Sequence, residues 1–293
     1  MCVDYRGLNS ITAKDRYLLL YIKDLLDKLH GARVFTKLDF ASGYHQVRLH
    51  SDNCHKTVFI APDGFYEYKV IRFGLANAPA AFMRMMYRIL HLHRRNEIVY
   101  LDDVLIFSRI VGEYKSHVEG VLQALQNTRI HLNEAKCVFG MLVMSFVGFR
   151  VNRHGIHTEE KKVRVVRHWP TPKTPMELCG FLGLAGYYRK FVPKFTHRAC
   201  LLQDLTAKPK NDYIWTSRHV DQFEDLKKDL ISALVLATLD PEADFILRTD
   251  ASDTAIGGVL AQKKLYEGRL VERPLGYFSR KLQAVKTRYP AYN

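Results

Sequence analysis

The stretch that decides the fold is Ile98-Val99-Tyr100-Leu101-Asp102-Asp103-Val104-Leu105-Ile106-Phe107, in which two adjacent aspartates separate two apolar runs. Neighbouring side chains in a regular strand point to opposite faces, so both carboxylates reach one side only if the chain bends between the runs. We therefore expect a hairpin with Asp102 and Asp103 in its tight turn. Taken alone, an Asp-Asp pair is more simply explained as turn chemistry.

A third aspartate, Asp39, closes a similar apolar run at residues 34–38. Three carboxylates gathered at one spot repel one another unless cations neutralise them, and hard divalent ions with oxygen ligands are the usual remedy. The sequence therefore predicts a magnesium site if Asp39 meets Asp102 and Asp103.

Composition limits the class of protein. The chain has 293 residues and 47% hydrophobic content, enough for one or two ordinary cores. It contains no run of 18 apolar residues, and Asp4 and Arg6 come early, so neither a membrane span nor a secretory signal is predicted. The five cysteines show no paired spacing. We expect reduced, structural thiols in an intracellular protein.

The charge indicates a polyanionic partner. A formal net charge of +14 and a pI near 9.5 favour binding to a phosphate backbone through counterion release. Basic residues concentrate in two clusters: Lys161, Lys162, Arg164 and Arg167, and then Arg189, Lys190, Lys194 and Arg198 among aromatic residues. Each cluster is explained equally well by nucleic-acid contact and by a solvated helical face with packed aliphatic stems.

Periodicity and turn signals predict a mixed α and β chain. Helices are expected at residues 22–29, 78–92, 116–128, 175–191 and 220–234, and strands at 34–38, 46–49, 138–139, 145–151, 245–249, 256–262 and 275–278. The sequence Thr174-Pro175-Met176-Glu177 is a capping box with proline at the first helical position. Gly180, Gly183 and Gly186 lie inside that helical pattern, so we expect a close backbone approach there and no phosphate-binding loop.

Several ordered motifs resemble those of reverse transcriptases, specifically those of gypsy-class long-terminal-repeat retrotransposons. Residues 99–108 are similar to the Tyr-x-Asp-Asp signature of that family. The other matching blocks are Val3-Asp4-Tyr5-Arg6-Gly7-Leu8-Asn9, Lys37-Leu38-Asp39-Phe40-Ala41-Ser42-Gly43-Tyr44-His45-Gln46 and Phe73-Gly74-Leu75-Ala76-Asn77-Ala78-Pro79. Residues 181–189 and 249–252 resemble the connecting region and the ribonuclease H start of the same polyproteins. The resemblance covers essentially the whole chain.

The resemblance implies an α/β (α+β) fold and an activity. Residues 1-155 would form a polymerase palm with partial fingers, 156-235 a helical thumb and connection, and 236-293 an incomplete ribonuclease H-like domain. The implied function is RNA-directed DNA synthesis, with two Mg²⁺ ions (Mn²⁺ also possible), an RNA or DNA template, a DNA or RNA primer and deoxynucleoside triphosphates. It would take place in a cytoplasmic retroelement particle or in the nucleus, without a membrane partner.

Roles for single residues follow from the same resemblance. Asp39 and Asp102 would be the principal metal ligands, Asp103 would assist, and the backbone carbonyl of Phe40 would complete the coordination. Tyr44 would exclude a ribose 2′ hydroxyl, although a half-buried strand tyrosine is the alternative. The remaining implied residues are Ser42 and Gly43 at the triphosphate, Phe73 and Gly74 bordering the nucleotide, and Phe146, Val147, Gly148 and Phe149 in a primer-holding hairpin, which also reads as a common strand.

The chain also departs from the family pattern. It opens at Met1 inside a motif, without upstream fingers strands, and Leu18, Leu20, Arg72 and Met83 stand where the family has prolines and a glutamine. A catalytically impaired remnant that only binds nucleic acid is therefore the alternative function. Asp250 resembles the first ribonuclease H ligand, but the chain ends at Asn293 before the helical glutamate. We expect no RNA-cleaving activity and treat Asp250 as a relic.

Overall fold

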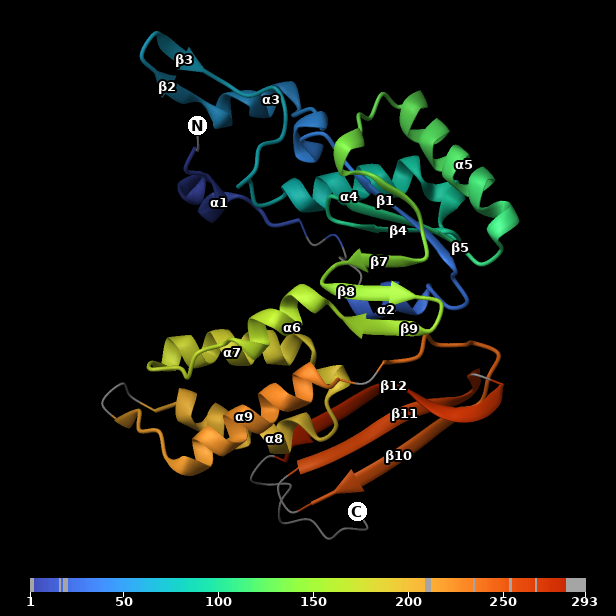
Figure 1. Ribbon diagram of the computed structural model, residues 1–293. Coiled ribbons are helices and arrows are strands. Elements are labelled where there is room, and N and C mark those ends of the chain that lie inside the picture. Colours follow the sequence, from blue (N-terminus) through green and yellow to red (C-terminus); the bar gives the residue numbers. More distant parts are fainter. Residues whose placement is uncertain are drawn as a thin grey trace. The chain divides into compact units, whose positions relative to one another are not determined.

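The computed structural model describes residues 3–15, 17, 21–208, 212–233, 235–252, 255–266 and 268–282. The chain divides into two compact units, Met1–Phe146 and Val147–Asn293, and each is described by itself (Figure 1). The predicted regions 1-155, 156-235 and 236-293 stay a prediction. Leu18, Leu20 and the chain end at Asn293 lie outside the described residues.

The first unit combines short helices with small antiparallel sheets. Its helices are α1 (Arg6–Ile11), α2 (Ile22–Asp27), α3 (Ser51–Cys54), α4 (Ala78–Ile89) and α5 (Tyr114–Asn127). Its strands are β1 (Val34–Asp39), β2 (Phe59–Ala61), β3 (Gly64–Tyr66), β4 (Glu97–Tyr100), β5 (Asp103–Ser108), β6 (Val138–Met141) and β7 (Val143–Phe146). One-turn 3-10 helices η1 (Gly43–Gln46) and η3 (His91–His93) complete the part that carries the site.

The central sheet of this unit has the strand order β4-β5-β1-β6, and its pairs are antiparallel. Residues directly opposite each other in an antiparallel pair share a face. Leu38 pairs with Val104, and Asp39 pairs with Asp103, so the apolar pair lies on one face and the acidic pair on the other.

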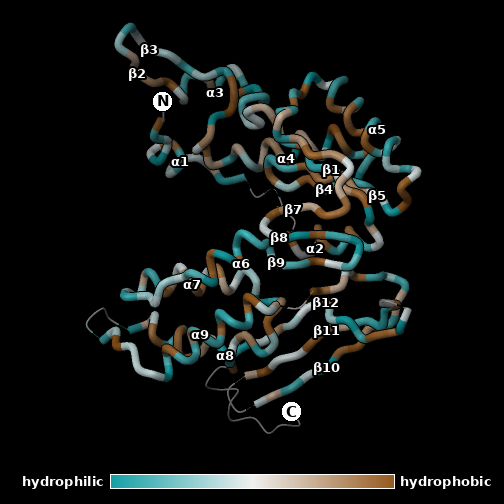
Figure 2. Tube along the Cα trace, viewed as in Figure 1, coloured by the Kyte–Doolittle hydropathy of each residue, from teal (hydrophilic) through white to brown (hydrophobic). Residues whose placement is uncertain are grey.

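Helices α4 and α5 cover the apolar face of this sheet. One buried cluster joins Leu38, Val104 and Ile106 of the sheet to residues of both helices, among them Phe82, Met83, Met86, Val118, Val121 and Leu125. Figure 2 shows hydrophobic colour along β4 and β5, whereas hydrophobic and hydrophilic stretches alternate along α5. This layer leaves the opposite face, with Asp39 and Asp103, free of the two helices.

The second unit consists of a β-hairpin, a helical group and a three-stranded sheet. Its elements are β8 (Phe149–Asn152), β9 (Gly155–Thr158), α6 (Glu160–Arg167), α7 (Pro175–Tyr187), η6 (Arg189–Phe191), α8 (Phe195–Thr206), α9 (Ser217–Ile231), β10 (Phe245–Ala251), β11 (Ala255–Tyr266) and β12 (Arg269–Lys281). Strands β10, β11 and β12 form the sheet in that order, with antiparallel pairs. Across the described ranges, no helix is both long and apolar enough to cross a membrane.

Two predicted strands were wrong. Residues 46–49 alternate like a strand, but the chain there leaves the 3-10 helix η1 and makes only an isolated bridge, between Arg48 and Val70. The predicted strand at 145–151 is interrupted, because β7 ends at Phe146 and β8 begins at Phe149 after a tight turn. Alternation in sequence cannot reveal a two-residue turn that needs a positive φ.

The predicted capping box starts α7 as expected, since the Thr174 hydroxyl accepts the backbone N–H of Glu177 at 3.2 Å. The Glu177 carboxylate instead accepts the backbone N–H of Lys173, one residue earlier than in the reciprocal motif. The expected close backbone approach at the glycines was wrong for Gly183 and Gly186, because a Cβ at either position would meet no described atom within 4 Å.

Candidate polymerase active site

The β4–β5 turn brings Asp102 next to the sheet edge. Tyr100 and Asp103 are paired, so Leu101 and Asp102 alone form the two-residue loop, and Asp103 already belongs to β5. The expectation that both aspartates occupy the turn was therefore wrong by one residue. Leu101 has φ 54°, a left-handed conformation that is rare for a large side chain, and its N–H donates to the Met83 sulfur at 3.0 Å.

The structure brings the three predicted carboxylates to the same end of the sheet. Asp39 is the last residue of β1 and lies directly opposite Asp103, the first residue of β5. Asp102 is exposed on the adjoining turn, whereas Asp39 and Asp103 are half-buried. Two separate strands and one turn thus supply the acidic groups.

Lys37 compensates part of this negative charge. Its ammonium lies 2.8 Å from Oδ1 of Asp103, a diagonal neighbour on the same face of the sheet. Burial raises the pKa of Asp103, Lys37 opposes that rise, and the charges of Asp102 and Asp39 add to it. Asp102 and Asp39 therefore lie close enough to Asp103 for their charges to act on it.

The donor set fits a hard divalent cation. Carboxylate oxygens are the ligands that Mg²⁺ and Mn²⁺ prefer, and the two neighbouring acids that raise the pKa of Asp103 favour a bound cation. As the side chains stand, no group of three or more His, Cys, Asp or Glu residues in the described part of the chain is arranged to hold an ion. Mg²⁺ does not need such a group, because one or two carboxylates together with substrate phosphates and water usually complete its coordination.

The segment that follows β1, next to the carboxylates, is closely packed. Phe40 lies opposite Leu132 in an isolated antiparallel bridge. The two hydrogen bonds of this bridge involve the carbonyl of Asp39 and the N–H of Ala41, so the Phe40 carbonyl is not used in it. Ser42 has φ 53°, and a Cβ at Gly43 would lie 3.4 Å from the rings of Phe82 and from Phe40.

Tyr44 is buried at 8% exposure in η1, so the strand alternative for this residue is wrong. Its ring meets Phe82 and Phe73 edge-on, with ring centres 5.5 and 4.9 Å apart. Burial raises the pKa of its phenol, and the nearby charge of Asp102 raises it further. The phenol therefore lies near enough to Asp102 to line the same site.

Helix α1 holds the segment after Phe73 and Gly74, the predicted border of the nucleotide pocket, through hydrogen bonds. The side-chain amide of Asn9, in α1, donates to the carbonyl of Gly74 at 2.7 Å, and its oxygen accepts the N–H of Ala76 at 2.8 Å. Gly74 has φ 96°, which favours glycine. Phe73 remains 57% exposed beside Tyr44, so its ring is available to a ligand.

The predicted primer-holding hairpin turns at Val147 and Gly148. Both have positive φ, 46° and 73°, as a type I′ hairpin turn requires. The hydroxyls of Tyr187 and Tyr188 donate to the carbonyls of Val147 and Gly148, each at 2.6 Å. Two consecutive tyrosines at the end of α7 thus fix this turn. Phe146, the last residue of β7, and Phe149, the first of β8, are both buried.

We expect Tyr188→Phe to lower the free energy of unfolding by about 1–2 kcal/mol, because it leaves the half-buried Gly148 carbonyl without its donor. Tyr188 is 2% exposed, whereas Tyr187 is 40% exposed and its loss is expected to cost less, since water can replace its hydroxyl. Urea denaturation of Tyr188→Phe and the matched control Tyr187→Phe measures both. Equal stability of Tyr188→Phe and the wild type would contradict the bracing role.

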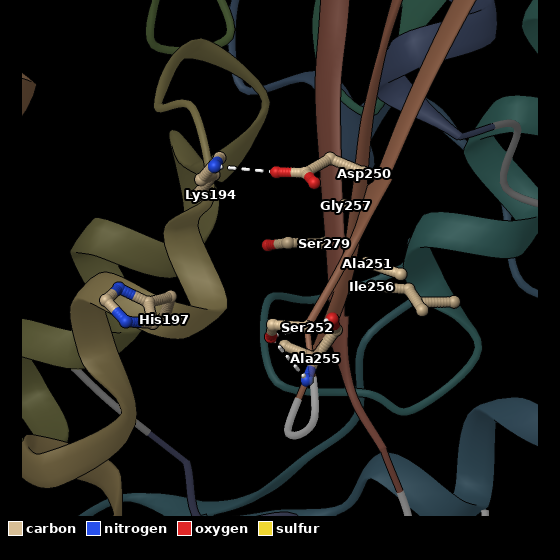
Figure 3. Close-up of a pocket in the computed structure, with 9 residues that line it drawn as sticks. All are labelled: Lys194, His197, Asp250, Ala251, Ser252, Ala255, Ile256, Gly257 and Ser279. Atoms are coloured by element: carbon tan, nitrogen blue, oxygen red, sulfur yellow. Dashed lines mark hydrogen bonds and ion pairs between the residues drawn. The ribbon is translucent and has the colours of Figure 1, made fainter. Parts of the chain in front are cut away.

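Asp250, the predicted ribonuclease H relic, faces a basic side chain. Figure 3 shows its carboxylate directed at Lys194, 2.6 Å away, at the mouth of a cavity of about 180 Å³ that Ser252 and Ser279 also line. The Lys194 side chain lowers the pKa of Asp250 through hydrogen bonding and charge. The absence of RNA cleavage stays a prediction.

The side chains of the second basic cluster are used in contacts within the folded chain. Arg198 pairs with Asp229 at 2.5 Å, Arg189 donates to the carbonyl of Ser279, Lys194 pairs with Asp250, and Lys190 is 8% exposed. The packing interpretation is therefore the better one here. In the first cluster, Arg164 pairs with Glu160 on the surface of α6, which decides nothing between the two alternatives.

Sequence reasoning missed two residues. Lys37 stands two positions before Asp39, and only the strand register shows that it meets Asp103. Met83 was noted only as a departure from the family pattern, yet its sulfur receives the N–H of the strained Leu101. The spacing of Lys37 and Asp39 on one face was the available signal for the first.

Comparisons with known proteins identify the family of the chain. The family model described as reverse transcriptase (RNA-dependent DNA polymerase) matches residues 1–183, and the chain belongs to this family. A model of the RNase H-like domain found in reverse transcriptase matches residues 215–293.

Curated relatives place the chain among retrotransposon polyproteins, as the motifs predicted. It is 36% identical over 294 residues to the Transposon Tf2-3 polyprotein of Schizosaccharomyces pombe, covering 99% of this chain and 22% of that protein. The Transposon Tf2-7 polyprotein of the same organism gives the same identity and coverage. The chain thus spans about a fifth of the length of these relatives.

Solved structures share the fold. The foamy viral protease-reverse transcriptase in complex with dsDNA has a TM-score of 0.88 at 22% identity, covering 100% of this chain and 60% of that chain. The same viral protein's dRH form with ds DNA has a TM-score of 0.89 at 21% identity, covering 99% and 50%. The predicted mixed α and β polymerase fold is confirmed.

Proposed function

We propose that this chain carries the active site of an RNA-directed DNA polymerase, which adds deoxynucleotides to a primer 3′ end. The single observation that supports it most is the placement of Asp39 opposite Asp103, with Asp102 on the adjoining turn, in a chain of the reverse transcriptase family. We place the reaction inside the cell, in a retroelement particle or the nucleus.

Asp39 and Asp102 would hold the divalent ions, for which Mg²⁺ is our choice and Mn²⁺ a substitute. Bound ions would activate the primer hydroxyl and neutralise charge on the transferred phosphoryl group. Lys37 keeps Asp103 oriented and compensates part of its negative charge. The turn with the strained Leu101 holds Asp102 at the edge of the sheet, where it can reach substrate.

The substrates we propose are a template, a primer and deoxynucleoside triphosphates. A chain with a net charge of +14 attracts polyanions. The foamy viral neighbour has been solved with dsDNA and with an RNA/DNA hybrid, which supports template and primer as partners. A remnant that only binds nucleic acid is not favoured, because the matched family and all three carboxylates indicate catalysis.

Extension of an oligo-dT primer on poly-A RNA with Mg²⁺ and dTTP tests the proposal. Primer growth that depends on the RNA template is the expected result. RNA-binding without any extension, under conditions in which a known reverse transcriptase extends the primer, would favour the binding remnant instead.

Tyr44→Val is expected to relax sugar selection, because a smaller side chain next to Phe73 leaves room for a ribose 2′ hydroxyl. We expect ribonucleotide incorporation relative to deoxynucleotide incorporation to rise on the order of 10-fold or more. Single-nucleotide extension with dTTP and UTP measures the ratio of kcat/KM values. Tyr44→Phe is the control, since it keeps the ring; an unchanged ratio in Tyr44→Val would remove Tyr44 from the sugar site.

A further inference from the structure

Helix α4 carries a basic surface that the proposed polymerase site does not use. Between Glu67 and Glu97 the sequence contains no acidic residue. Arg84, Arg88 and His91 follow one another at helical spacing, and Arg94 continues the row after η3. Together with Tyr17 and Tyr87 they line a hollow of about 440 Å³, which we call the α4 basic hollow.

Two of the guanidinium groups are held in place by aromatic rings. Arg84 lies over the ring of Tyr17, 5.1 Å from its centre, and Arg94 lies over the ring of Tyr87, 5.7 Å from its centre. The two tyrosine rings are themselves 6.2 Å apart. The resulting order is arginine, tyrosine, tyrosine, arginine. Fixed cations lose less side-chain entropy when they bind an anion than free surface lysines do.

Cations in the hollow exceed the anions that face them. Asp15 pairs with Arg84 at 2.6 Å. Glu97 is buried beneath, 1% exposed, and burial raises its pKa to about 7 against the charges of Lys28 and Arg94, so it carries about half a negative charge at neutral pH. Arg88 is exposed and makes no ion pair within the described residues. Arg88 and Arg94 therefore remain available to an external anion.

The α4 basic hollow lies away from the carboxylates. Helix α4 packs on the sheet face that carries Leu38 and Val104, whereas Asp39 and Asp103 are on the opposite face. A substrate held at the carboxylates would not reach the outer side of α4 through the sheet. The hollow is a separate site.

We propose that the α4 basic hollow binds the phosphate backbone of single-stranded RNA, apart from the catalytic carboxylates. Guanidinium groups match phosphate oxygens in geometry, and successive arginines along a helix rise by about 6 Å per four residues, which suits a chain of phosphates better than one small anion. The hollow is shallow and open, and its arginines beside Tyr17 and Tyr87 match the combination of basic groups and aromatic rings that binds single strands.

The test is the affinity of the full chain for a fluorescently labelled oligo-A RNA, measured by anisotropy at several salt concentrations. The variant Arg88→Gln/Arg94→Gln is expected to bind roughly tenfold more weakly at low salt, and its log–log salt slope should be less steep by about 1.4, the value for two phosphate contacts to a single strand. The matched control Arg33→Gln/Arg109→Gln removes the same charge from exposed positions elsewhere in this unit.

A second readout locates the contact and does not depend on activity. Hydrogen exchange at residues 84–95 should slow in the wild type when the RNA is added. The single variant Arg88→Gln, whose side chain has no ion pair to lose within the described part of the chain, should weaken that protection. Primer extension on a short template should be unchanged in both. Equal RNA affinity in the double variant and its control, or protection by a polyglutamate peptide but not by RNA, would overturn the proposal.

Discussion

Replacing Asp102 by asparagine is expected to abolish primer extension and to leave nucleic-acid binding in place. The substitution keeps the size of the side chain and removes the charge that would hold a divalent ion. Losing several kcal/mol of transition-state stabilisation corresponds to a rate lower by roughly 1000-fold. The measurement is extension of oligo-dT on poly-A RNA, with anisotropy of the same labelled duplex as the binding readout.

Asp52→Asn is the matched control, because Asp52 is exposed in the same unit and lies outside the proposed site. It should extend the primer at the wild-type rate. If Asp102→Asn retained near wild-type extension, Asp102 would not be a metal ligand. If it lost both extension and duplex binding, the effect would lie in folding or binding and not in catalysis.

Glu97→Gln is expected to stabilise the protein at alkaline pH and to change little in acid. Glu97 is 1% exposed, and within the described residues its Oε2 has no hydrogen-bond partner. Burial raises its pKa from the ordinary 4.5 to about 7, against the opposing charges of Lys28 and Arg94. The folded state therefore keeps a proton that the unfolded chain releases.

The sign of the pH dependence follows from that difference. Below the unfolded-state pKa of 4.5 Glu97 is protonated in both states and does not lower the free energy of unfolding. Between pH 4.5 and about pH 7 the free energy of unfolding falls as pH rises, because only the unfolded chain releases the proton. Above pH 7 both states are ionised and the full loss of stability remains. That cost is about 3 kcal/mol. Thermal unfolding at pH 5 and pH 8 should show a gain for Glu97→Gln mainly at pH 8. The exposed control Glu119→Gln should show none, and an equal gain at both pH values would contradict the buried charge.

The hairpin around Asp102 could be predicted from sequence because its signal is local. Two apolar runs with a polar break leave few arrangements, and the position of Asp39 after a third apolar run suggested a shared metal site if it met the other two aspartates. The register could not be read in advance. One residue decides whether Asp103 sits in the turn or in the strand, and hence whether Lys37 reaches it.

The errors share a physical cause. Residues 46–49 alternate like a strand, but Gln46 instead uses its side-chain amide to bind the carbonyls of Ala41 and His131, both at 2.8 Å. This side-chain contact, which holds Gln46 in η1 and leaves only the bridge at Arg48, leaves no mark on apolar periodicity. The turn at Val147 was hidden for a similar reason, because its stabilising hydroxyls come from Tyr187 and Tyr188, distant in sequence.

The basic clusters illustrate the limit of composition. Arg198 and Lys194 looked as suitable for nucleic acid as any other cations, yet each has an acidic partner in the folded chain. The arginines of α4 do not form a dense basic cluster in the sequence, but in the fold they line a common hollow. Charge counts predict the kind of partner, whereas the fold decides which charges are free to meet it.

Divalent-ion binding at the three carboxylates is the most direct test of the account. Titration of the protein with Mn²⁺, followed by the loss of the free-ion electron paramagnetic resonance signal, should show binding in the wild type in the presence of primer, template and nucleotide. We predict that the variant Asp39→Asn/Asp102→Asn loses that binding while its circular dichroism spectrum stays unchanged. Undiminished Mn²⁺ binding by this folded variant would contradict the account.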